Sequence, residues 1–150
     1  MLIEQLKEIV GPKGWSTDLI DLELKLTDWR RTFTGATPIV VSPANTDEVA
    51  AVVRACAKAQ VALVPQGGNT GMCAGAVPDE SGAQIVLCMA RMNAIRDVDA
   101  MNYSMEVEGG CILYDVQNAA NKEDRLFALS LGAEGSCQIG GNISTNAGGI

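Results

Sequence analysis

Glycine is concentrated in two stretches of this chain, and both stretches are almost free of charge. Ten of the 16 glycines lie at residues 67–75 and 132–149. Residues 62–78 and 135–150 contain no Asp, Glu, Lys or Arg. A surface loop ordinarily carries some charge, so we expect something to cover these segments. Glycine lets the main chain turn freely and lets a ligand approach without meeting a Cβ, which favours a binding role over two ordinary tight turns.

The residue types between the glycines indicate the kind of ligand. Successive main-chain N–H groups in such turns form a concavity that binds an anion. Asn69, Thr70, Ser136 and Asn142 add neutral hydrogen-bonding side chains. Such a site satisfies a phosphate-bearing ligand without burying an unpaired lysine, which would be costly. The pattern by itself predicts a phosphate or dinucleotide site and nothing narrower.

Two common phosphate-binding motifs are excluded by spacing. A P-loop requires Gly-Lys followed by Ser or Thr, and the sequence contains no Gly-Lys. The dinucleotide motif G-x-G-x-x-G is absent at residues 64–71, where the glycines are Gly67, Gly68 and Gly71. A nicotinamide-type Rossmann domain is therefore disfavoured.

Hydrophobic periodicity predicts mixed helices and strands in the first half of the chain. Residues 2–10 have the pattern of an amphipathic helix, which Gly11 and Pro12 end. Residues 39–41 form a β-branched run typical of a strand. Asn45 with Glu48 resembles a capping box before a helix that ends near Gln60.

Residues 61–64 predict a buried strand that leads straight into the first glycine stretch. Strands are also predicted at residues 85–89 and 103–108, and a helix at residues 112–124. Residues 16–31 are helix or loop. A boundary between two subdomains is expected near Gly109 and Gly110.

Charge and cysteine usage restrict the partners and the compartment. The formal charge is −7 and no basic stripe is present, so nucleic acid is not expected as a partner. The five cysteines are irregularly spaced and histidine is absent, which argues against a metal site and predicts reduced cysteines in a cytoplasmic protein. The first ten residues resemble a helix rather than a signal peptide. Because the sequence stops within a glycine stretch, we expect it to be part of a longer protein.

Together these residues resemble a known family. The segments 65–71, 77–78, 135–142 and 145–149 are similar to the FAD-linked oxidase family with the vanillyl-alcohol-oxidase (PCMH-type) flavin-binding fold. Within it, the likeness is greatest to D-2-hydroxyglutarate dehydrogenases, D-lactate dehydrogenases and glycolate oxidase flavin subunits. Further matches occur at residues 27–30, 90–93 and 131–133.

The resemblance implies an α+β FAD-binding domain of two α/β subdomains. It implies an N-terminal helical segment at 1–36, subdomain 1 at 37–109, and an incomplete subdomain 2 at 110–150, with the substrate (cap) domain outside the chain. FAD would be bound non-covalently, since the histidine that attaches it in some relatives is replaced by Asn69 and Thr70. The implied cofactor-binding residues are Pro65, Gln66, Gly67, Gly68, Asn69, Thr70, Gly71, Met72, Gly75, Val77, Gly135, Ser136, Ile139, Gly140, Gly141, Asn142, Thr145, Asn146, Gly148 and Gly149.

The function implied by this resemblance is oxidation of a D-2-hydroxy acid to the 2-oxo acid by hydride transfer to FAD. A separate electron acceptor, such as an electron-transfer flavoprotein or a quinone, would then be needed. No catalytic base and no metal ligand is identified within these 150 residues, so the segment alone is expected to be inactive. Alternatives left open are a sugar or aldonolactone oxidase, a non-catalytic FAD-carrying electron-transfer subunit, and a binding module for another nucleotide. The hydroxy acid, the acceptor and dimerisation are also left open.

Overall fold

The chain divides into two compact units. In the computed structural model, which describes residues 1–149, unit 1 is Met1–Arg91 and unit 2 is Met92–Ile150. The division falls earlier in the chain than the expected boundary near Gly109, because strand β5 (Ile95–Asp99) pairs with strand β6 (Ser104–Val107) and so belongs to unit 2. No helix in residues 1–149 is long and apolar enough to cross a bilayer.

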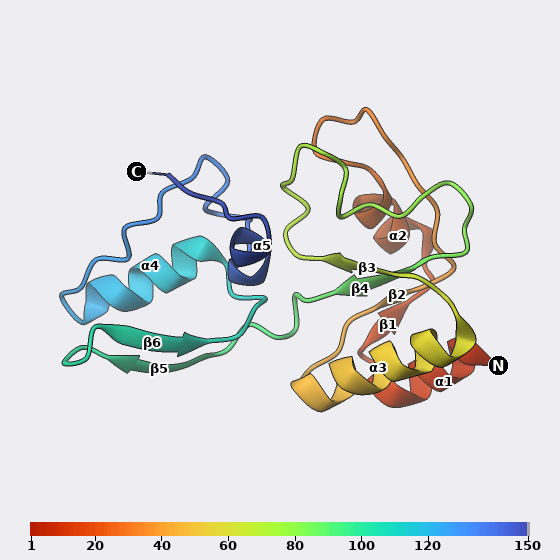
Figure 1. Ribbon diagram of the computed structural model, residues 1–150, viewed down its shortest axis with the longest axis horizontal. Helices are drawn as coiled ribbons and strands as arrows, with labels where there is room; N and C mark the ends of the chain where they lie inside the picture. The colour runs from red at the N-terminus through yellow and green to blue at the C-terminus, as the bar shows by residue number, and fades with distance from the viewer. Residues whose placement is uncertain (150) are drawn as a thin grey trace. The chain divides into compact units, whose positions relative to one another are not determined.

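Unit 1 is built on a four-stranded sheet in the order β1-β2-β4-β3 (Figure 1). The strands are β1 (Trp15–Ser16), β2 (Val40–Val41), β3 (Leu63–Gln66) and β4 (Ile85–Cys88). Strands β2 and β3 both pair with β4 in parallel, and β1 pairs with β2 in antiparallel. Helix α3 connects β2 to β3, and these two strands are not neighbours in the sheet, because β4 lies between them.

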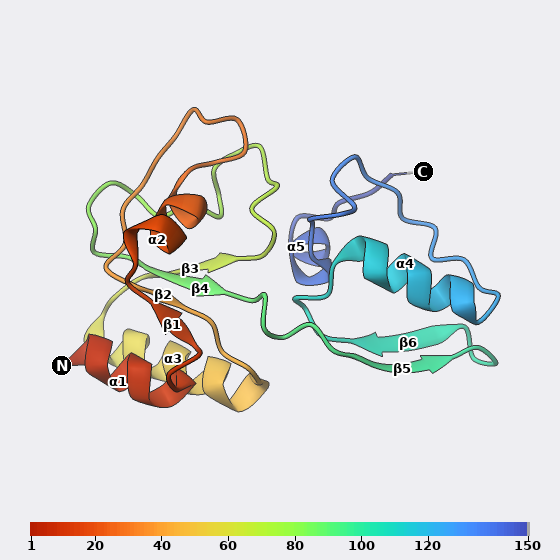
Figure 2. The same ribbon diagram turned by 180° about the vertical axis from the view of Figure 1, so that it is seen from behind.

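Helices cover both faces of this sheet because its central strands are buried on both sides. One face, including Val41 and Leu87, packs against α1 (Leu2–Val10) and α3 (Thr46–Ala59). The opposite face, with Val86 and Cys88, packs against α2 (Leu19–Leu26). Figures 1 and 2 show α1 and α3 on one side of the strands and α2 on the other.

Local sequence signals account for α3. The Asn45 side chain accepts the Glu48 N–H at 2.9 Å, as an N-cap does. The Glu48 carboxylate accepts the Ala44 N–H at 2.7 Å, one residue before the position that a capping box would use. Gln60 ends the helix in the left-handed conformation, with φ 55°. The predicted cap is confirmed, and its second hydrogen bond is displaced by one residue.

Strand β3 lies two residues later than the predicted strand at 61–64. The Val61 N–H bonds to the Cys56 carbonyl at 3.0 Å, so Val61 is still held by the last turn of α3 rather than by the sheet. The shift places Gln66 in the strand, beside Cys88 of β4. Strand β1 was not predicted, since a two-residue strand has no period to detect.

Unit 2 combines the β5–β6 hairpin with helices α4 (Leu113–Lys122) and α5 (Ile139–Ser144). Its core is the cluster Cys111, Leu113, Val116, Cys137 and Ile139. The hairpin carries a bulge between Ile95 and Asp97. Strand β5 and helix α5 were missed, because charges interrupt the alternation of β5 and glycines dilute the helical pattern of α5. The chain is α+β, as predicted.

Candidate functional site

The first glycine stretch follows the carboxyl end of a parallel strand. Residues 67–76, called the glycine loop below, begin directly after Gln66 of β3. The Gln66 carbonyl accepts the Met89 N–H at 3.0 Å, so β3 and β4 end side by side. In open α/β sheets, ligands bind outside the carboxyl ends of the strands. The topology therefore places this loop where a ligand is expected.

The glycine loop presents unused main-chain donors. The N–H groups of residues 67–72 make no hydrogen bond to any described group of unit 1. These residues are partly or largely exposed, so water satisfies the donors until an acceptor replaces it. Consecutive unpaired N–H groups in a turn attract an anion.

The loop is also open to close approach by a ligand. A Cβ added at Gly71 or Gly75 would meet no heavy atom within 4 Å. Asn69 and Ala74 adopt left-handed φ angles of 52° and 55°, so the chain turns sharply twice. An uncovered main chain with no charged side chain suits a phosphate group that approaches the backbone.

Two predicted site residues use their amide nitrogens to hold this loop. Gln66 is fully buried, and its Nε2 donates to the Lys25 and Ala76 carbonyls, each at 2.8 Å. Asn69 Nδ2 donates to the Thr27 carbonyl at 2.8 Å. Gln66 Oε1 has no partner among the described residues.

The remaining predicted residues of this stretch differ in exposure. Val77 is buried, and its N–H closes a turn on the Ala74 carbonyl at 3.1 Å. Met72 is 52% exposed, with Arg30 Nη2 3.8 Å from its sulfur. Pro65 is exposed, and Thr70 is half-buried. Arg30 is thus a cation beside an otherwise uncharged loop.

The second glycine stretch separates into open and packed glycines. Gly135, Gly141 and Gly148 would each accept a Cβ without contact within 4 Å. In contrast, a Cβ on Gly140 would lie 2.9 Å from the Gly109 carbonyl oxygen. A Cβ on Gly149 would collide with the Ser130 carbonyl. Close packing therefore explains Gly140 and Gly149, whereas an added Cβ at any of the other four glycines, Gly132 included, meets nothing within 4 Å.

Helix α5 has two different sides. Ile139, Asn142 and Asn146 line an apolar hollow of about 470 Å³ within unit 2. The buried Asn142 Oδ1 has no partner among the described residues. On the other side lies Gly141, whose carbonyl accepts the Thr145 hydroxyl at 2.8 Å. Ser136 is exposed in the turn before the helix. Of the predicted cofactor-binding residues in and next to α5, Ile139, Asn142 and Asn146 line the apolar pocket, whereas the main chain at Gly141 is not covered by other residues.

Ionisable groups near the glycine loop have structural roles. Asp28 accepts N–H groups from Phe33, Thr32 and Arg30, and these bonds hold its pKa below the usual value. Asp79 Oδ1 accepts the Ser81 N–H at 3.0 Å and so organises a turn. Among residues 1–149 no three side chains of His, Cys, Asp or Glu are placed to hold a metal ion.

In unit 2, Glu108 accepts the Ala94 N–H at 2.9 Å and the Arg96 guanidinium at 2.7 Å. The Ala94 bond, followed by the Arg96 interaction, lowers the pKa of Glu108. Both oxygens of this carboxylate are hydrogen-bonded, and they join the two open ends of the β5–β6 hairpin. The carboxylate is therefore unsuited to act as a base.

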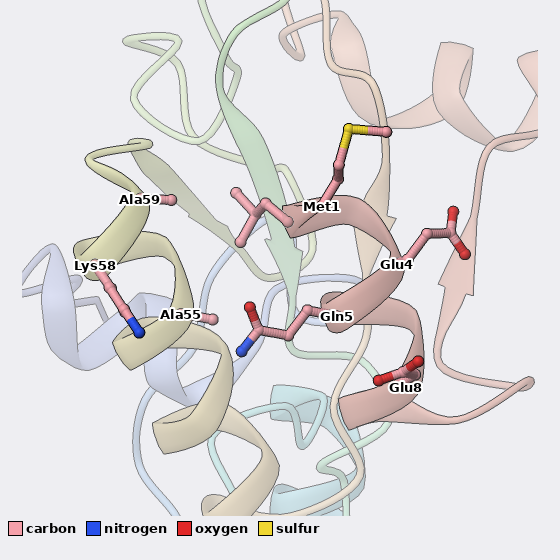
Figure 3. Close-up of a pocket in the computed structure, with 8 residues that line it drawn as sticks. Met1, Glu4, Gln5, Glu8, Ala55, Lys58 and Ala59 are labelled. Carbon is pink, nitrogen blue, oxygen red and sulfur yellow. The ribbon is translucent and has the colours of Figure 1, made fainter.

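A second hollow, of about 430 Å³, lies between α1 and α3 (Figure 3). In Figure 3 the Gln5 amide is directed towards α3 and the Glu4 carboxylate away from it. Ala59 on its rim lies four residues before β3 begins, at the opposite end of that strand from the glycine loop. Its mixed lining contains no grouping of reactive side chains.

Comparison with known sequences identifies the family. Residues 37–150 match the FAD binding domain family. The chain is 39% identical over 150 residues to a D-2-hydroxyglutarate dehydrogenase of Arabidopsis thaliana, covering 99% of this chain and 26% of that protein. It is 37% identical to that of Rattus norvegicus, covering 95% and 26%, and 38% identical to that of Xanthomonas citri pv. viticola, covering 99% and 31%. The chain spans about a quarter of the length of the first two relatives.

These names contradict the expected cytoplasmic location. The relatives from Arabidopsis thaliana, Rattus norvegicus and Bos taurus are all named as mitochondrial. Reduced cysteines were the basis of the expectation, and they do not distinguish cytoplasm from other reducing compartments.

Solved structures agree with the fold. An alkyldihydroxyacetonephosphate synthase matches with a TM-score of 0.86 at 21% identity, covering 99% of this chain and 29% of that one. Xylooligosaccharide oxidase from Myceliophthora thermophila C1 matches with a TM-score of 0.76 at 18% identity, covering 94% and 29%. At such identities the likeness concerns the fold alone. The family match covers most of the residues described above, including both glycine stretches, and the chain therefore belongs to the FAD binding domain family.

Proposed function

We propose that this chain is the FAD-holding part of a flavin-dependent dehydrogenase that oxidises a D-2-hydroxy acid to the 2-oxo acid. The observation that carries the proposal is the glycine loop, with its run of unpartnered N–H groups at the carboxyl end of β3. The relatives at 37–39% identity, named D-2-hydroxyglutarate dehydrogenases, support the substrate class.

The residues present fit the pyrophosphate of FAD. Phosphate oxygens accept hydrogen bonds and cannot donate them, and residues 67–72 offer main-chain donors. The open main chain at Gly71 and Gly75 allows close approach. In unit 2, Gly135, Gly141 and Gly148 offer the same uncovered backbone. We propose that both sets contact the cofactor.

When bound, FAD accepts a hydride from the carbon that carries the substrate hydroxyl. The part of the chain described here would hold and orient the cofactor. Oxidation also requires a base for the hydroxyl proton and cations for the substrate carboxylate. Arg30 is a cation beside Met72 of the glycine loop, but no base is identified among the described residues there. We propose that the base, and the cations that hold the substrate carboxylate, are supplied by other parts of the full-length protein. A separate acceptor would take up the electrons.

The test uses the full-length protein. An absorption spectrum of the purified protein, followed by heat release and identification of the flavin, would establish the cofactor. Anaerobic mixing with D-2-hydroxyglutarate should then bleach the flavin, and the L-enantiomer should not. D-lactate, glycolate and simple sugars serve as competing substrates.

Three results would redirect the proposal. Bleaching by sugars but by no hydroxy acid would indicate a sugar oxidase. Stoichiometric FAD that no substrate reduces would indicate an electron-transfer subunit. Absence of flavin, with no binding of added FAD, would refute the proposal itself.

A further inference from the structure

A short hairpin of unit 1 lies against the glycine loop. Residues 26–35, called the 26–35 hairpin below, are closed by two main-chain bonds: Gly35 N–H to the Leu26 carbonyl at 2.8 Å, and Asp28 N–H to the Phe33 carbonyl at 3.0 Å. Between these bonds, Thr27 and Thr34 form an antiparallel bridge. Residues 36–66 separate this segment from the glycine loop, and it carries no glycine-rich pattern of its own.

The Asp28 carboxylate fills the hairpin. Asp28 is 2% exposed, and Oδ1 accepts the N–H groups of Thr32 at 2.8 Å and Phe33 at 2.7 Å. Its Oδ2 accepts the Arg30 N–H and the Thr32 hydroxyl, each at 3.2 Å. No salt bridge is formed by this carboxylate in the described residues. A buried carboxylate is costly without hydrogen-bond partners. The four donors therefore stabilise the ionised form of Asp28, and these bonds hold the hairpin in one conformation.

The hairpin connects to the glycine loop through side-chain amides. Asn69 Nδ2 donates to the Thr27 carbonyl, next to Asp28 in sequence, at 2.8 Å. Gln66 Nε2 donates at 2.8 Å both to the Lys25 carbonyl, just before the hairpin, and to the Ala76 carbonyl at the end of the loop. Asn69 of the loop and Gln66 just before it are thus bonded to the Thr27 and Lys25 carbonyls, and Gln66 also holds the end of the loop at Ala76.

Asn69 is the residue of the loop on which its connection to the hairpin most depends. Its φ of 52° is unfavourable for most residues, although Asn tolerates it. The bond to Thr27 holds this turn, and the turn sets the direction of the neighbouring N–H groups. A preorganised set of donors binds an anion more tightly than a mobile set, because ordering cost is not incurred on binding.

We infer that Asp28 is a positioning residue for FAD: it shapes the 26–35 hairpin, which presents the Thr27 carbonyl to Asn69 and thereby fixes the glycine loop. The inference rests on the proposed function. Asp28 itself lies inside the hairpin and contacts hairpin donors, so it acts through Thr27 and Asn69 rather than on the cofactor.

The experiment is a double-mutant cycle in the full-length protein, with FAD added back to the flavin-free form. Asn69→Gly removes the amide and keeps the left-handed turn accessible, and Asp28→Asn removes the charge with little change in shape. Each single variant should raise the Kd for FAD by about 2- to 10-fold, the value of one or two hydrogen bonds. The double variant should bind FAD as Asn69→Gly does, because both changes break one connection.

Controls separate this effect from general damage. Asn121→Asp makes a polar change at an exposed residue of α4 and should leave the Kd unchanged. If Asp28→Asn does not fold, Thr32→Val removes only the hydroxyl donor to Asp28 and enters the same cycle. The thermal midpoint of each flavin-free variant is measured alongside, since a purely structural role would lower it without coupling to Asn69 in the Kd.

Additive losses of affinity in the double variant would overturn the inference, and so would an unchanged Kd in Asn69→Gly. Both results require that the unaltered protein binds FAD. If the unaltered protein does not bind FAD, the proposed function fails instead, and the two failures are therefore distinguishable.

Discussion

Gly140 at the start of α5 lies directly on the main chain of Gly109. Its N–H donates to the Gly109 carbonyl at 2.8 Å, and a Cβ on Gly140 would lie 2.9 Å from the same oxygen. The next residue, Gly141, would accept a Cβ without contact within 4 Å. Adjacent glycines of one motif therefore have different reasons to be glycine: the first allows packing, and the second leaves the backbone uncovered.

This difference predicts that two matched substitutions change the free energy of unfolding unequally. Gly140→Ala should lower the free energy of unfolding by about 1–3 kcal/mol, since the methyl group forces the Gly109 backbone to move. Gly141→Ala should be neutral or stabilising by up to about 1 kcal/mol, because alanine favours the helix. Urea unfolding of the flavin-free full-length protein measures both. Equal stability of the two variants would contradict the packing described for Gly140.

Charge placed at the open glycines should release the cofactor. An added Cβ at Gly71 or Gly141 meets no heavy atom within 4 Å. Gly71→Asp and Gly141→Asp should each raise the Kd for FAD by at least about tenfold through repulsion of the pyrophosphate. Fluorescence titration of the flavin-free protein gives the Kd. Gly132→Asp is the matched control, because Gly132 is equally open and is not a predicted contact. Full FAD retention in the Gly71 and Gly141 variants would remove these glycines from the site.

Asp28 should make the stability of unit 1 depend on pH. Hydrogen bonds from Phe33 and Thr32 lower its pKa in the folded protein from the ordinary value of 3.8. A carboxylate with a depressed folded pKa stabilises the fold at pH values above its unfolded pKa and loses that contribution as the pH falls through the folded pKa. The unaltered protein should therefore exceed Asp28→Asn in thermal midpoint at pH 7, and the difference should shrink below about pH 4. A difference that is constant from pH 7 to pH 3 would argue against this role.

The cysteines should differ strongly in reactivity. Cys73 in the glycine loop is exposed, whereas Cys56, Cys88, Cys111 and Cys137 are buried. Burial also raises the pKa of Cys56 and of Cys111, which lowers the reactive thiolate fraction. Iodoacetamide followed by peptide mass spectrometry should find Cys73 modified first among these five.

The same labelling experiment, repeated in the presence of FAD, tests whether the cofactor lies against Cys73. If the glycine loop binds the cofactor, saturating FAD should slow the modification of Cys73, and Cys73→Ser should leave FAD binding intact. An unchanged labelling rate in the presence of FAD would place the cofactor away from this part of the loop. Labelling of Cys56 before Cys73 would contradict the burial of the Cys56 side chain on the inner face of α3.

Local sequence was sufficient to predict the helices and strands whose hydrophobic or capping pattern is strong. Asn45 and Glu48 marked the start of α3, and the apolar run at 85–88 marked β4, because caps and buried strands depend on neighbouring residues. Strand β3 begins later than predicted because Val61, just after the Gln60 cap of α3, still donates its N–H to the Cys56 carbonyl of that helix. Helix α5 escaped detection, since two of its six residues are glycine.

The sequence by itself determined that two uncharged, glycine-rich segments exist and that the first follows a buried strand. It also carried enough of the motif to indicate the family. Only the tertiary structure decided which side chains are free to meet a cofactor: Gln66 and Asn69 use their amide nitrogens on carbonyls 41 and 42 residues away. Those partners depend on how α2 packs across the sheet, a long-range arrangement set by burial of Val86 and Cys88 against Leu22 rather than by any local preference of residues 66–69.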